Sequence, residues 1–429
     1  MTENMCQPPG IRPMNFEPFA LPVTKVMPNG VVLYHIPGDG KGSVRFDILF
    51  DGGYGVQSKP LQAMFVNRML REGCEGLSAN EISYRLDYYG AWIDMFSSQS
   101  CNHLTLHSLS KHFYPLLELL ESVVKTPLFP EDNLETVRRN NRSYFVVNSH
   151  KVDILSQRHF EHSLWGGEHP LGHIVVPEDY DAITRDDLLE YYRRVYGSAN
   201  CTIFVAGSVD EAMLAAIEKH FGSETWGTGE AVQPFLVQKP SPEYGRKTVY
   251  VDGVLQSSVK LGFMAMDAGD SDFFKFRFLS VLFGGYFGSR LMSNIREENG
   301  YTYHIAAEVD AYGCRNAFMI SSETANEYVE PLLDEVYREM ERLVEKPAPA
   351  EEVELVRNYI MGELCREYEG VSAKSEVFIN AWLSGESFSS VNEYIEVVAS
   401  VTADELHDVA KKYLARKNLI EIIVGAASV

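Results

Sequence analysis

An arginine and a tyrosine seven positions apart, Arg296 and Tyr303, are the side chains of this 429-residue chain best suited to chemistry. A guanidinium and a phenol held on neighbouring elements can donate hydrogen bonds to a peptide carbonyl, or to the oxyanion that develops from it. The pair also fits a simpler interpretation, a surface arginine and a half-buried tyrosine in an ordinary α+β domain, because polar sites are more often structural than catalytic. The spacing alone leaves both interpretations open.

The residues around the pair predict the elements that position it. A glycine-rich turn at Gly284–Gly288 follows an apolar helix. Ser289 suits the N-cap of the next helix, which carries the arginine. Gly300 ends that helix, and Tyr301–Ala307 is expected to continue as a strand.

This stretch resembles a signature in the second half of the insulinase, pitrilysin and mitochondrial processing peptidase family of zinc peptidases. That signature is a Gly-Gly turn, Ser-Arg-Leu, Arg-Glu, Gly and a tyrosine seven residues after the arginine. The matching residues are Ser289, Arg290, Leu291, Arg296, Glu297, Gly300 and Tyr303. The resemblance implies that Arg296 and Tyr303 are catalytic residues that hold the substrate backbone at a metal site. It also implies that Ser289, Arg290 and Gly300 are substrate-binding residues.

The zinc site of the resembled family is degenerate in this chain. In the family, His-x-x-Glu-His on a helix supplies two zinc ligands and a general base, and a glutamate about 76 residues later is the third ligand. Alignment on the flanking residues puts Met64, Asn67 and Arg68 at the motif positions, and Tyr144 at the third ligand. A thioether is too soft for this site, an amide accepts no proton and a guanidinium repels a metal. No metal is therefore expected, although Arg68 could put a positive charge where the metal would have been.

Other histidines offer no second metal site. The sequence contains neither His-x-x-Glu-His nor His-Glu-x-x-His. His103 and His107 share a strand face, but they stand roughly 13 Å apart at ~3.3 Å per residue. His159 and His162 are neighbours on a helix and lack a third ligand.

Composition and charge exclude several classes of function. The chain is 45% hydrophobic and 23% charged, as in ordinary globular proteins, and its net charge is −22. Such an acidic chain lacks the clustered Lys and Arg that nucleic-acid binding needs. No run approaches ~18 uninterrupted apolar residues, so no membrane span is expected.

The cysteines and the N-terminal residues predict a cytoplasmic protein. The six cysteines are Cys6, Cys74, Cys101, Cys201, Cys314 and Cys365. They form no Cys-x-x-Cys pair and lie far apart, which is typical of reduced core residues. Residues 1–16 carry neither the basic region nor the apolar region of a signal peptide.

An internal repeat predicts two domains of one fold. Segments of the first half recur in the second half, in the same order and at an offset of 215–219 residues. The corresponding pairs are Val44 and Val259, Pro115 and Pro331, Glu135 and Glu354, and Thr184 and Thr402. We therefore expect a tandem duplication of an α+β unit, each unit a largely antiparallel sheet packed with helices. The resembled family has the same two-domain clamshell, so the resemblance covers essentially the whole chain.

A stretch rich in glycine and proline, without helical periodicity, separates the two repeats. The predicted N-terminal domain, residues 1–225, is peptidase-like with a degenerate zinc site. Residues 226–246 form the linker, and the C-terminal domain, residues 247–429, carries Arg296 and Tyr303.

Taken with the resemblance, these features predict the non-catalytic subunit of a heterodimeric zinc peptidase. In two-chain members of the resembled family, one subunit carries zinc, and a homologous subunit contributes the arginine and tyrosine across a closed chamber. Arg296 and Tyr303 would bind the peptide carbonyl next to the scissile bond, while zinc in the partner activates the water. The expected partners are a homologous zinc-bearing subunit and peptide substrates.

Two alternatives remain open. Some members of the resembled family have lost peptidase function, so the chain could be an inactive scaffold or peptide-binding protein of the same fold. An active stand-alone peptidase would require metal ligands that the sequence does not contain. The sequence leaves open the peptide substrate, the identity of the partner and whether the chain pairs with itself.

Overall fold

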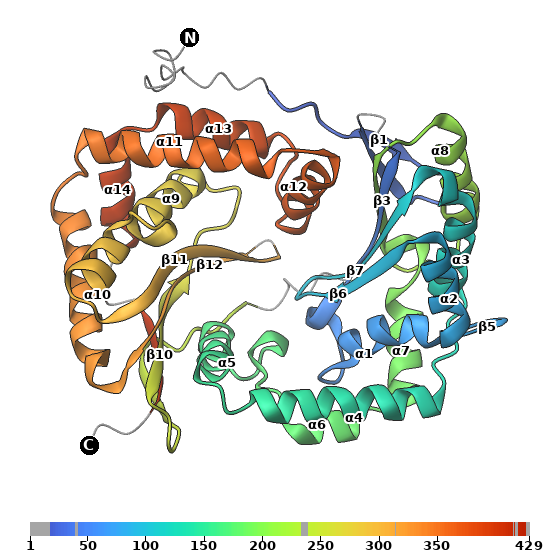
Figure 1. Ribbon diagram of the computed structural model, residues 1–429, viewed down its shortest axis with the longest axis horizontal. Coiled ribbons are helices and arrows are strands. Elements are labelled where there is room, and N and C mark those ends of the chain that lie inside the picture. The colour runs from blue at the N-terminus through green and yellow to red at the C-terminus, as the bar shows by residue number, and fades with distance from the viewer. Residues whose placement is uncertain are drawn as a thin grey trace, which may run out of the picture.

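The computed structural model describes residues 18–38, 42–232, 239–313, 315–414, 416 and 419–425. In them the chain forms two halves side by side, each with one large sheet and a set of helices (Figure 1). Cys74, Cys101 and Cys201 are buried, as expected, whereas Cys365 is exposed, and Cys6 and Cys314 lie outside the described residues. No helix in the described ranges is both long and apolar enough to cross a membrane.

The N-terminal sheet has six strands in the order β1-β2-β8-β3-β7-β6. Their bounds are β1 Val23–Val26, β2 Val32–Pro37, β3 Ser43–Asp51, β6 Trp92–Ser97, β7 Cys101–Leu109 and β8 Cys201–Gly207. β3 pairs antiparallel with β7 and β8, whereas β2 and β8 run parallel. The short β4 (Gly73–Cys74) and β5 (Leu77–Ser78) pair separately.

The C-terminal sheet has five strands in the order β11-β12-β10-β13-β9. Their bounds are β9 Gly245–Tyr250, β10 Gln256–Met264, β11 Thr302–Tyr312, β12 Arg315–Ala325 and β13 Ile420–Gly425. Taken from the other end, this order matches β2-β8-β3-β7-β6, and the parallel pair β9–β13 matches β2–β8. The predicted fold, two duplicated and largely antiparallel sheets with helices, is confirmed.

Each half has a set of helices, most of which cover the outer face of its own sheet. In the N-terminal half they are α1 Gln62–Met69, α2 Ala79–Tyr89, α3 Phe113–Lys125, α4 Glu131–Asn148, α5 Val152–Trp165, α6 Pro177–Ala182, α7 Arg185–Val195 and α8 Glu211–Ile217. In the C-terminal half they are α9 Phe273–Ser280, α10 Val329–Glu345, α11 Ala350–Glu367, α12 Val371–Leu383, α13 Ser390–Ser400 and α14 Ala403–Tyr413. On β3, Val44, Phe46 and Ile48 point into the core beneath these helices. The alternation along a strand puts Arg45 and Asp47 on the opposite, inner face.

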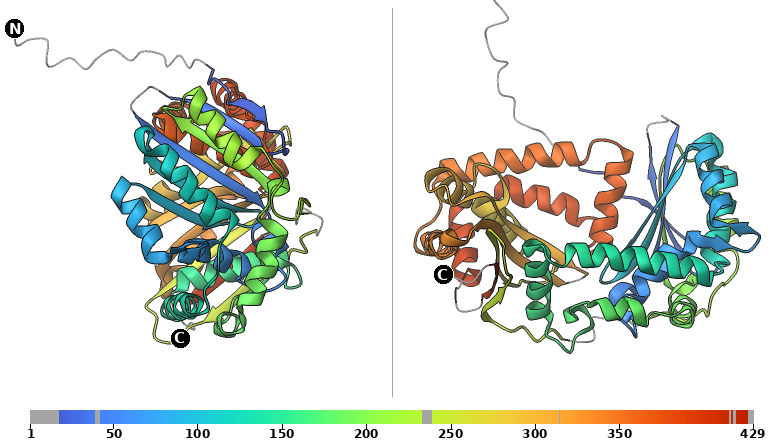
Figure 2. Two further views of the ribbon diagram at one scale, coloured as in Figure 1. Left: turned by 90° about the vertical axis from the view of Figure 1, so that its right-hand side faces the viewer. Right: turned by 60° about the horizontal axis from the view of Figure 1, so that its bottom comes forward.

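The two halves exchange one helix each. α4 crosses from the N-terminal half on one side of the molecule and ends beside the C-terminal sheet, where α5 packs on β10 and β13 (Figures 1 and 2). α11 crosses on the opposite side and leads to α12, which packs on β2 and β8 of the N-terminal sheet. Phe160, Leu164 and Trp165 of α5 share an apolar cluster with Ile420 and Ile422 of β13. Each inner sheet face is therefore partly covered by a helix of the other half.

The close approach of α5 to β10 requires a glycine, and this gives a stability prediction. A Cβ at Gly262 of β10 would lie 2.0 Å from the Phe318 carbonyl oxygen and 2.8 Å from Cζ of Phe160 on α5. We expect Gly262→Ala to lower the free energy of unfolding by about 1–3 kcal/mol, the usual cost of overpacking a core. Urea unfolding measures this change.

A matched substitution in α11 is the control for this prediction. A Cβ at Gly362 meets no atom within 4 Å, and alanine is a better helix former than glycine by ~0.5–1 kcal/mol. Gly362→Ala should therefore leave the urea midpoint unchanged or raise it. An unchanged midpoint for Gly262→Ala would contradict the tight α5–β10 contact.

Local features set several element ends. The helical chain breaks at Ser149, between α4 and α5. A capping box of Thr184 and Asp187 begins α7. α1 begins at Gln62, after Leu61, which adopts a left-handed φ of 72°. β9 begins at Gly245, inside the expected linker, of which residues 233–238 lie outside the described residues.

Candidate functional site

The segment that carries Arg296 is a wide, π-helical turn, Met292–Glu298. The Asn299 amide donates to the Asn294 carbonyl at 3.0 Å, five residues back. Such turns are rare and occur frequently at functional sites. Gly300 has a left-handed φ of 67° and reverses the chain into β11, which begins with a bulge between Thr302 and Ile305. Gly300 is therefore needed for its backbone conformation.

Arg296 and Tyr303 lie near the solvent with unused donors. The Arg296 guanidinium carbon lies 4.5 Å from the centre of the Phe287 ring, and that ring is 61% exposed. Tyr303 is 88% exposed at the beginning of β11, an edge strand of its sheet. Among the described residues, neither side chain has a hydrogen-bond or ion-pair partner. Both can therefore donate to a group from outside the chain.

Buried polar groups brace the turn from behind. Asn294 Nδ2 donates to Glu339 Oε1 at 2.6 Å and to Glu335 Oε2 at 3.3 Å, both on α10. Asn299 Nδ2 donates to Asn294 Oδ1 at 2.7 Å. Arg338 and Arg342 pair with the two carboxylates. This network fixes the turn and does not involve the Arg296 side chain. Its members belong to no catalytic sequence motif, so the sequence does not predict it.

The side chains of Ser289 and Arg290 pack within the chain, and their expected role in substrate binding stays a prediction. Ser289 is 1% exposed, and its Oγ, which was expected to cap the helix, accepts no bond from it. Arg290 forms two 2.7 Å hydrogen bonds to the Glu352 carboxylate of α11. The family motif fixes these residue types, but their side chains hold the turn against its neighbours. Of the three expected substrate-binding residues, only Gly300 lies beside the exposed pair.

The four degenerate zinc positions are spread over α1 and α4. Met64 is half-buried, Arg68 is exposed, and Tyr144 on α4 is 73% exposed. Asn67 is buried and donates to the Phe96 carbonyl at 2.6 Å, so it ties α1 to the edge strand β6. Throughout the described ranges, no group of three His, Cys, Asp or Glu side chains could hold a metal ion. Met64 instead lines a cavity of about 320 Å³ between the halves.

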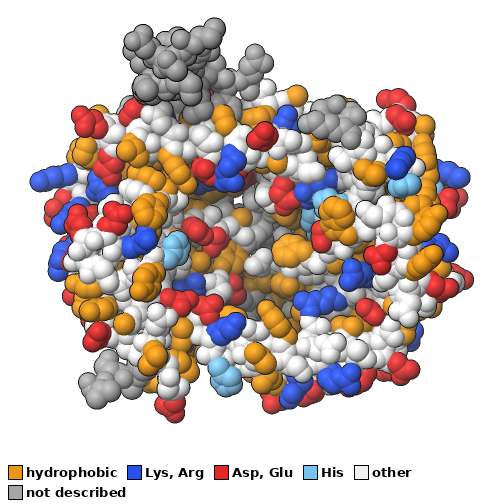
Figure 3. All heavy atoms as spheres, viewed as in Figure 1, with side chains coloured by type: hydrophobic (Ala, Val, Ile, Leu, Met, Phe, Trp, Pro, Cys, Tyr) orange, Lys and Arg blue, Asp and Glu red, His pale blue; other side chains and the backbone are white. Residues whose placement is uncertain are grey.

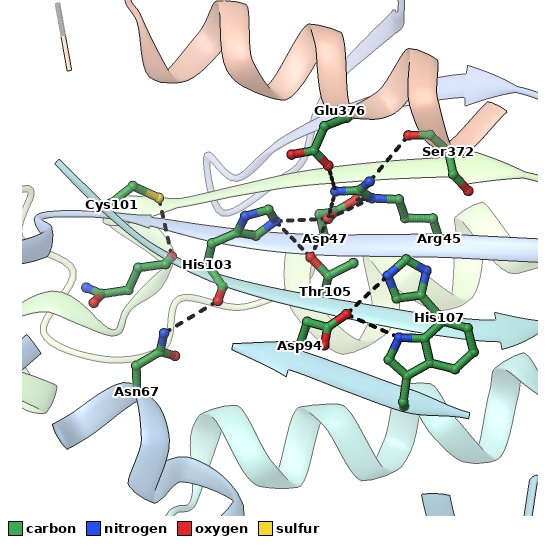
Figure 4. Close-up of polar contacts among 12 residues, drawn as sticks. Arg45, Asp47, Asn67, Asp94, Cys101, His103, Thr105, His107, Ser372 and Glu376 are labelled. Atoms are coloured by element: carbon green, nitrogen blue, oxygen red, sulfur yellow. Dashed lines mark hydrogen bonds and ion pairs between the residues drawn. The ribbon is translucent and has the colours of Figure 1, made fainter. Parts of the chain in front are cut away.

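A buried ionic cluster joins the inner face of the N-terminal sheet to α12 (Figure 4). Asp47 of β3 is fully buried, and Arg45 donates to both its oxygens, at 3.1 and 2.9 Å. His103 Nε2 and Thr105 Oγ1 lie 2.9 and 2.7 Å from Asp47 Oδ1. Nη2 of the Arg45 guanidinium, which also donates to Asp47 Oδ1, contacts Glu376 of α12 at 2.5 Å. His103 therefore has a place in an ion network, and His107 stacks on Trp92 instead, at 4.7 Å between ring centres.

In the Arg45 cluster, the charged neighbours offset the cost of burying Asp47 and Arg45. Burial alone would raise the pKa of Asp47, but the hydrogen bonds and charges of His103 and Arg45 hold that pKa below its ordinary value. Burial opposes the charge on Arg45 too, yet Asp47 and Glu376 raise its pKa. The cluster thus fixes the two halves to each other. Charged side chains also surround the hollow between the halves on the face shown in Figure 3.

The chain is similar in sequence and in fold to several known proteins. A family profile described as "Peptidase M16 inactive domain" matches residues 182–360, which include the Arg296 turn. An uncharacterized zinc protease of Rickettsia bellii is 23% identical over 354 residues, 82% of this chain and 84% of that protein. "Non-peptidase homolog YmxG" of Helicobacter pylori is 21% identical over 393 residues, 88% of each chain. A solved "peptidase M16 inactive domain" from Pseudomonas fluorescens, 20% identical, covers 95% of this chain and 98% of its own, with a TM-score of 0.84.

Proposed function

We propose that this chain, an inactive member of the M16 peptidase family, serves as the non-catalytic subunit of a two-chain zinc peptidase. The family resemblance found in the sequence is confirmed. In the proposed assembly, a homologous chain with an intact His-x-x-Glu-His motif holds the metal. This chain contributes Arg296 and Tyr303 to the shared site.

The proposal is carried by one observation, the unused donors of Arg296 and Tyr303 on a braced turn. A side chain that the fold does not need is free to bind a ligand, and a rigid backbone beneath it limits the entropy lost on binding. Phe287 supports the guanidinium through its ring face, a contact that leaves the N–H groups available. The position of Tyr303 at the start of an edge strand makes it reachable by another chain.

The two side chains suit an oxyanion. The Arg296 guanidinium presents several N–H donors with a permanent positive charge, and the Tyr303 hydroxyl presents one more donor. Donors fixed before the reaction stabilise the charge that develops on a peptide carbonyl oxygen. The residues at positions 64, 67 and 68 supply no zinc ligand and no general base. The partner subunit must therefore supply both the metal and the activated water.

A second candidate function is an inactive scaffold or peptide-binding protein. The Helicobacter pylori relative is named a non-peptidase homologue, which favours this alternative for that protein. The ionic cluster at Asp47, which fixes the two halves, also fits a scaffold. A cytoplasmic location stays a prediction for both candidates.

Reconstitution separates the two functions. We would mix this purified chain with an M16 homologue from the same organism that has the complete motif, and assay a quenched peptide library. The proposed function expects zinc-dependent cleavage by the mixture and little or none by either chain alone. Cleavage by the homologue alone at the rate of the mixture would favour the scaffold, and cleavage by this chain alone would refute both.

A further inference from the structure

We propose that the cavity beside the degenerate zinc positions is a binding site for a carboxylate that carries a small apolar group. Such a ligand is either the C-terminal residue of a peptide or a short free carboxylic acid. The site is separate from the Arg296 turn, since neither Arg296 nor Tyr303 lines the cavity. It does not depend on the proposed peptidase function.

The cavity has the size and position of a ligand site. Its volume of about 320 Å³ lies at the lower end of the range for small-molecule sites, ~300–1,000 Å³. Its walls come from residues 54–64, Gln99, α5, the loop after α5 and the end of β11, so both halves form it. The lining residues include Tyr54, Leu61, Met64, Arg158, Glu161, Trp165, Leu171, Val175 and Tyr312.

One guanidinium lines the cavity, and a second lies on α1 outside the lining. Arg158 lines the cavity and is half-buried, with its guanidinium carbon 4.3 Å from the centre of the Phe145 ring. Arg68, at the second histidine position of the lost motif, is exposed on α1. Within the described ranges, neither guanidinium has a hydrogen-bonded or ion-paired acceptor. Each therefore has N–H donors available to a carboxylate.

The two arginines act on the same neighbours. The charge of Arg68 lowers the pKa of the Tyr54 and Tyr180 hydroxyls, although burial, the larger influence, raises both pKa values. Arg158 also acts on Tyr180. The pKa of Arg158 itself is lowered, first by burial, so its charge lacks full compensation in the folded chain. A bound anion would compensate it.

Part of the remaining wall is apolar, and Gln57, Gln99 and His173 also line the cavity. Leu61 and Met64 face the cavity from the α1 side, and Leu171, Val175 and the Trp165 ring line it from α5 and the following loop. This wall suits a branched or linear aliphatic group of a few carbons, and burial of each CH₂ favours binding. The residue that replaced a zinc ligand, Met64, thus becomes part of an apolar surface.

Glu161 is the one acidic side chain in the lining, and it has partners of its own. Gln157 Nε2 donates to its Oε1 at 2.9 Å, and Lys260 of β10 also acts on it. Burial raises the pKa of Glu161. Glu161 would favour a cationic ligand if it dominated the cavity, so an amine is the informative opposing probe.

Three six-carbon probes test the charge that the cavity selects. Hexanoate, hexanamide and hexylamine share an alkyl chain and differ only in the head group. Isothermal titration gives the dissociation constants. We expect hexanoate to bind at least about tenfold more tightly than the other two, as one charged hydrogen bond implies. Equal binding of all three, tighter binding of hexylamine, or no binding of hexanoate would overturn the proposal.

Variants of the two arginines test which groups hold the carboxylate. We expect Arg158→Gln to weaken hexanoate binding roughly ten- to hundredfold, and Arg68→Gln, which removes a charge outside the cavity lining, to weaken it less. Arg158→Lys should retain part of the affinity because it keeps the charge. Arg139→Gln, at an exposed arginine of α4 outside the cavity lining, is the matched control. Unchanged affinity in a folded Arg158→Gln would refute the site, and if that variant does not fold, the selectivity among the three six-carbon probes decides.

Peptide probes separate the two sources of the carboxylate. Acetyl-Ala-Ala-Leu with a free C-terminus is compared with the same peptide as a C-terminal amide. Binding of the free form only would identify a peptide C-terminus as the ligand. Binding of hexanoate without either peptide would identify a free acid, and binding of neither hexanoate nor the free peptide would end the proposal.

Discussion

Replacing Arg296 with alanine is expected to lower the turnover of the assembled peptidase by about 10²–10³-fold, the usual loss for one oxyanion donor. Tyr303→Phe, which removes only the hydroxyl group, should lower it by a similar factor. Neither side chain has a polar partner among the described residues, so neither substitution should disturb the fold or the pairing. Single-turnover cleavage of a quenched peptide by the reconstituted pair measures the effect.

A control on the same turn separates chemistry from structure. Glu298→Ala changes an exposed residue two positions from Arg296 and should leave turnover within about twofold, since surface substitutions of this kind usually have small effects. Sedimentation of each mixture reports whether the pair still forms. Full turnover in both Arg296→Ala and Tyr303→Phe would contradict the shared site. Loss of pairing would instead place the two residues in the interface.

The brace under the turn explains why the effect should be local. Asn294 is held by Glu335 and Glu339, and this contact persists when the Arg296 side chain is removed. The turn is thus rigid because of residues that touch no substrate. A sequence motif contains the hydrogen-bond donors that a reaction requires. A supporting network, in contrast, can form from any buried polar residues that hydrogen-bond to one another.

The duplication could be predicted from the sequence because each repeat keeps its element order and spacing. A capping box such as Thr184–Asp187 depends only on residues that are close in the sequence, so the sequence alone predicts where the helix begins. The exchange of α5 and α12 could not be predicted. An apolar helix face specifies that it must be covered, but not which of two similar sheets covers it.

The sequence predicted those parts of the site in which the residue type determines the backbone conformation. Gly300 is where the motif puts it because its φ of 67° needs glycine. Ser289 and Arg290 belong to the same motif, and because Ser289 is buried and Arg290 pairs with Glu352, their part in substrate binding stays a prediction. The Arg158 cavity was not predicted because its residues come from several separate segments, which only the folded chain brings together.

Replacing Arg45 with methionine is expected to destabilise the chain by roughly 3 kcal/mol, the lower end of the cost of breaking a buried ion pair. Methionine fills much of the same volume, so the loss is mainly electrostatic. Asp47 would remain fully buried and charged with only His103 and Thr105 as partners. The N-terminal sheet would also lose its ion pair to Glu376 on α12. Urea unfolding measures the free energy, and hydrogen exchange over Val371–Leu383 should show the release of α12.

An exposed ion pair is the matched control. Arg142 pairs with Asp181 at 3.1 Å, with both side chains largely exposed, and such pairs contribute ~0–1 kcal/mol. Arg142→Met should therefore change stability by no more than that amount. Equal effects of Arg45→Met and Arg142→Met would mean that the buried cluster does not hold the halves together.

The pH dependence of the Arg45→Met effect tests its cause. Asp47 has a pKa below its ordinary value in the folded chain, so its contribution is present above the unfolded pKa of ~3.9. That contribution is lost as pH falls through the lower, folded pKa, because protonation then favours the unfolded chain. The difference between the wild type and Arg45→Met should accordingly be constant near neutral pH and shrink in acid. A difference that stays constant into acid would show that Arg45 acts through packing of its aliphatic stem on α12, and not through the charge of Asp47.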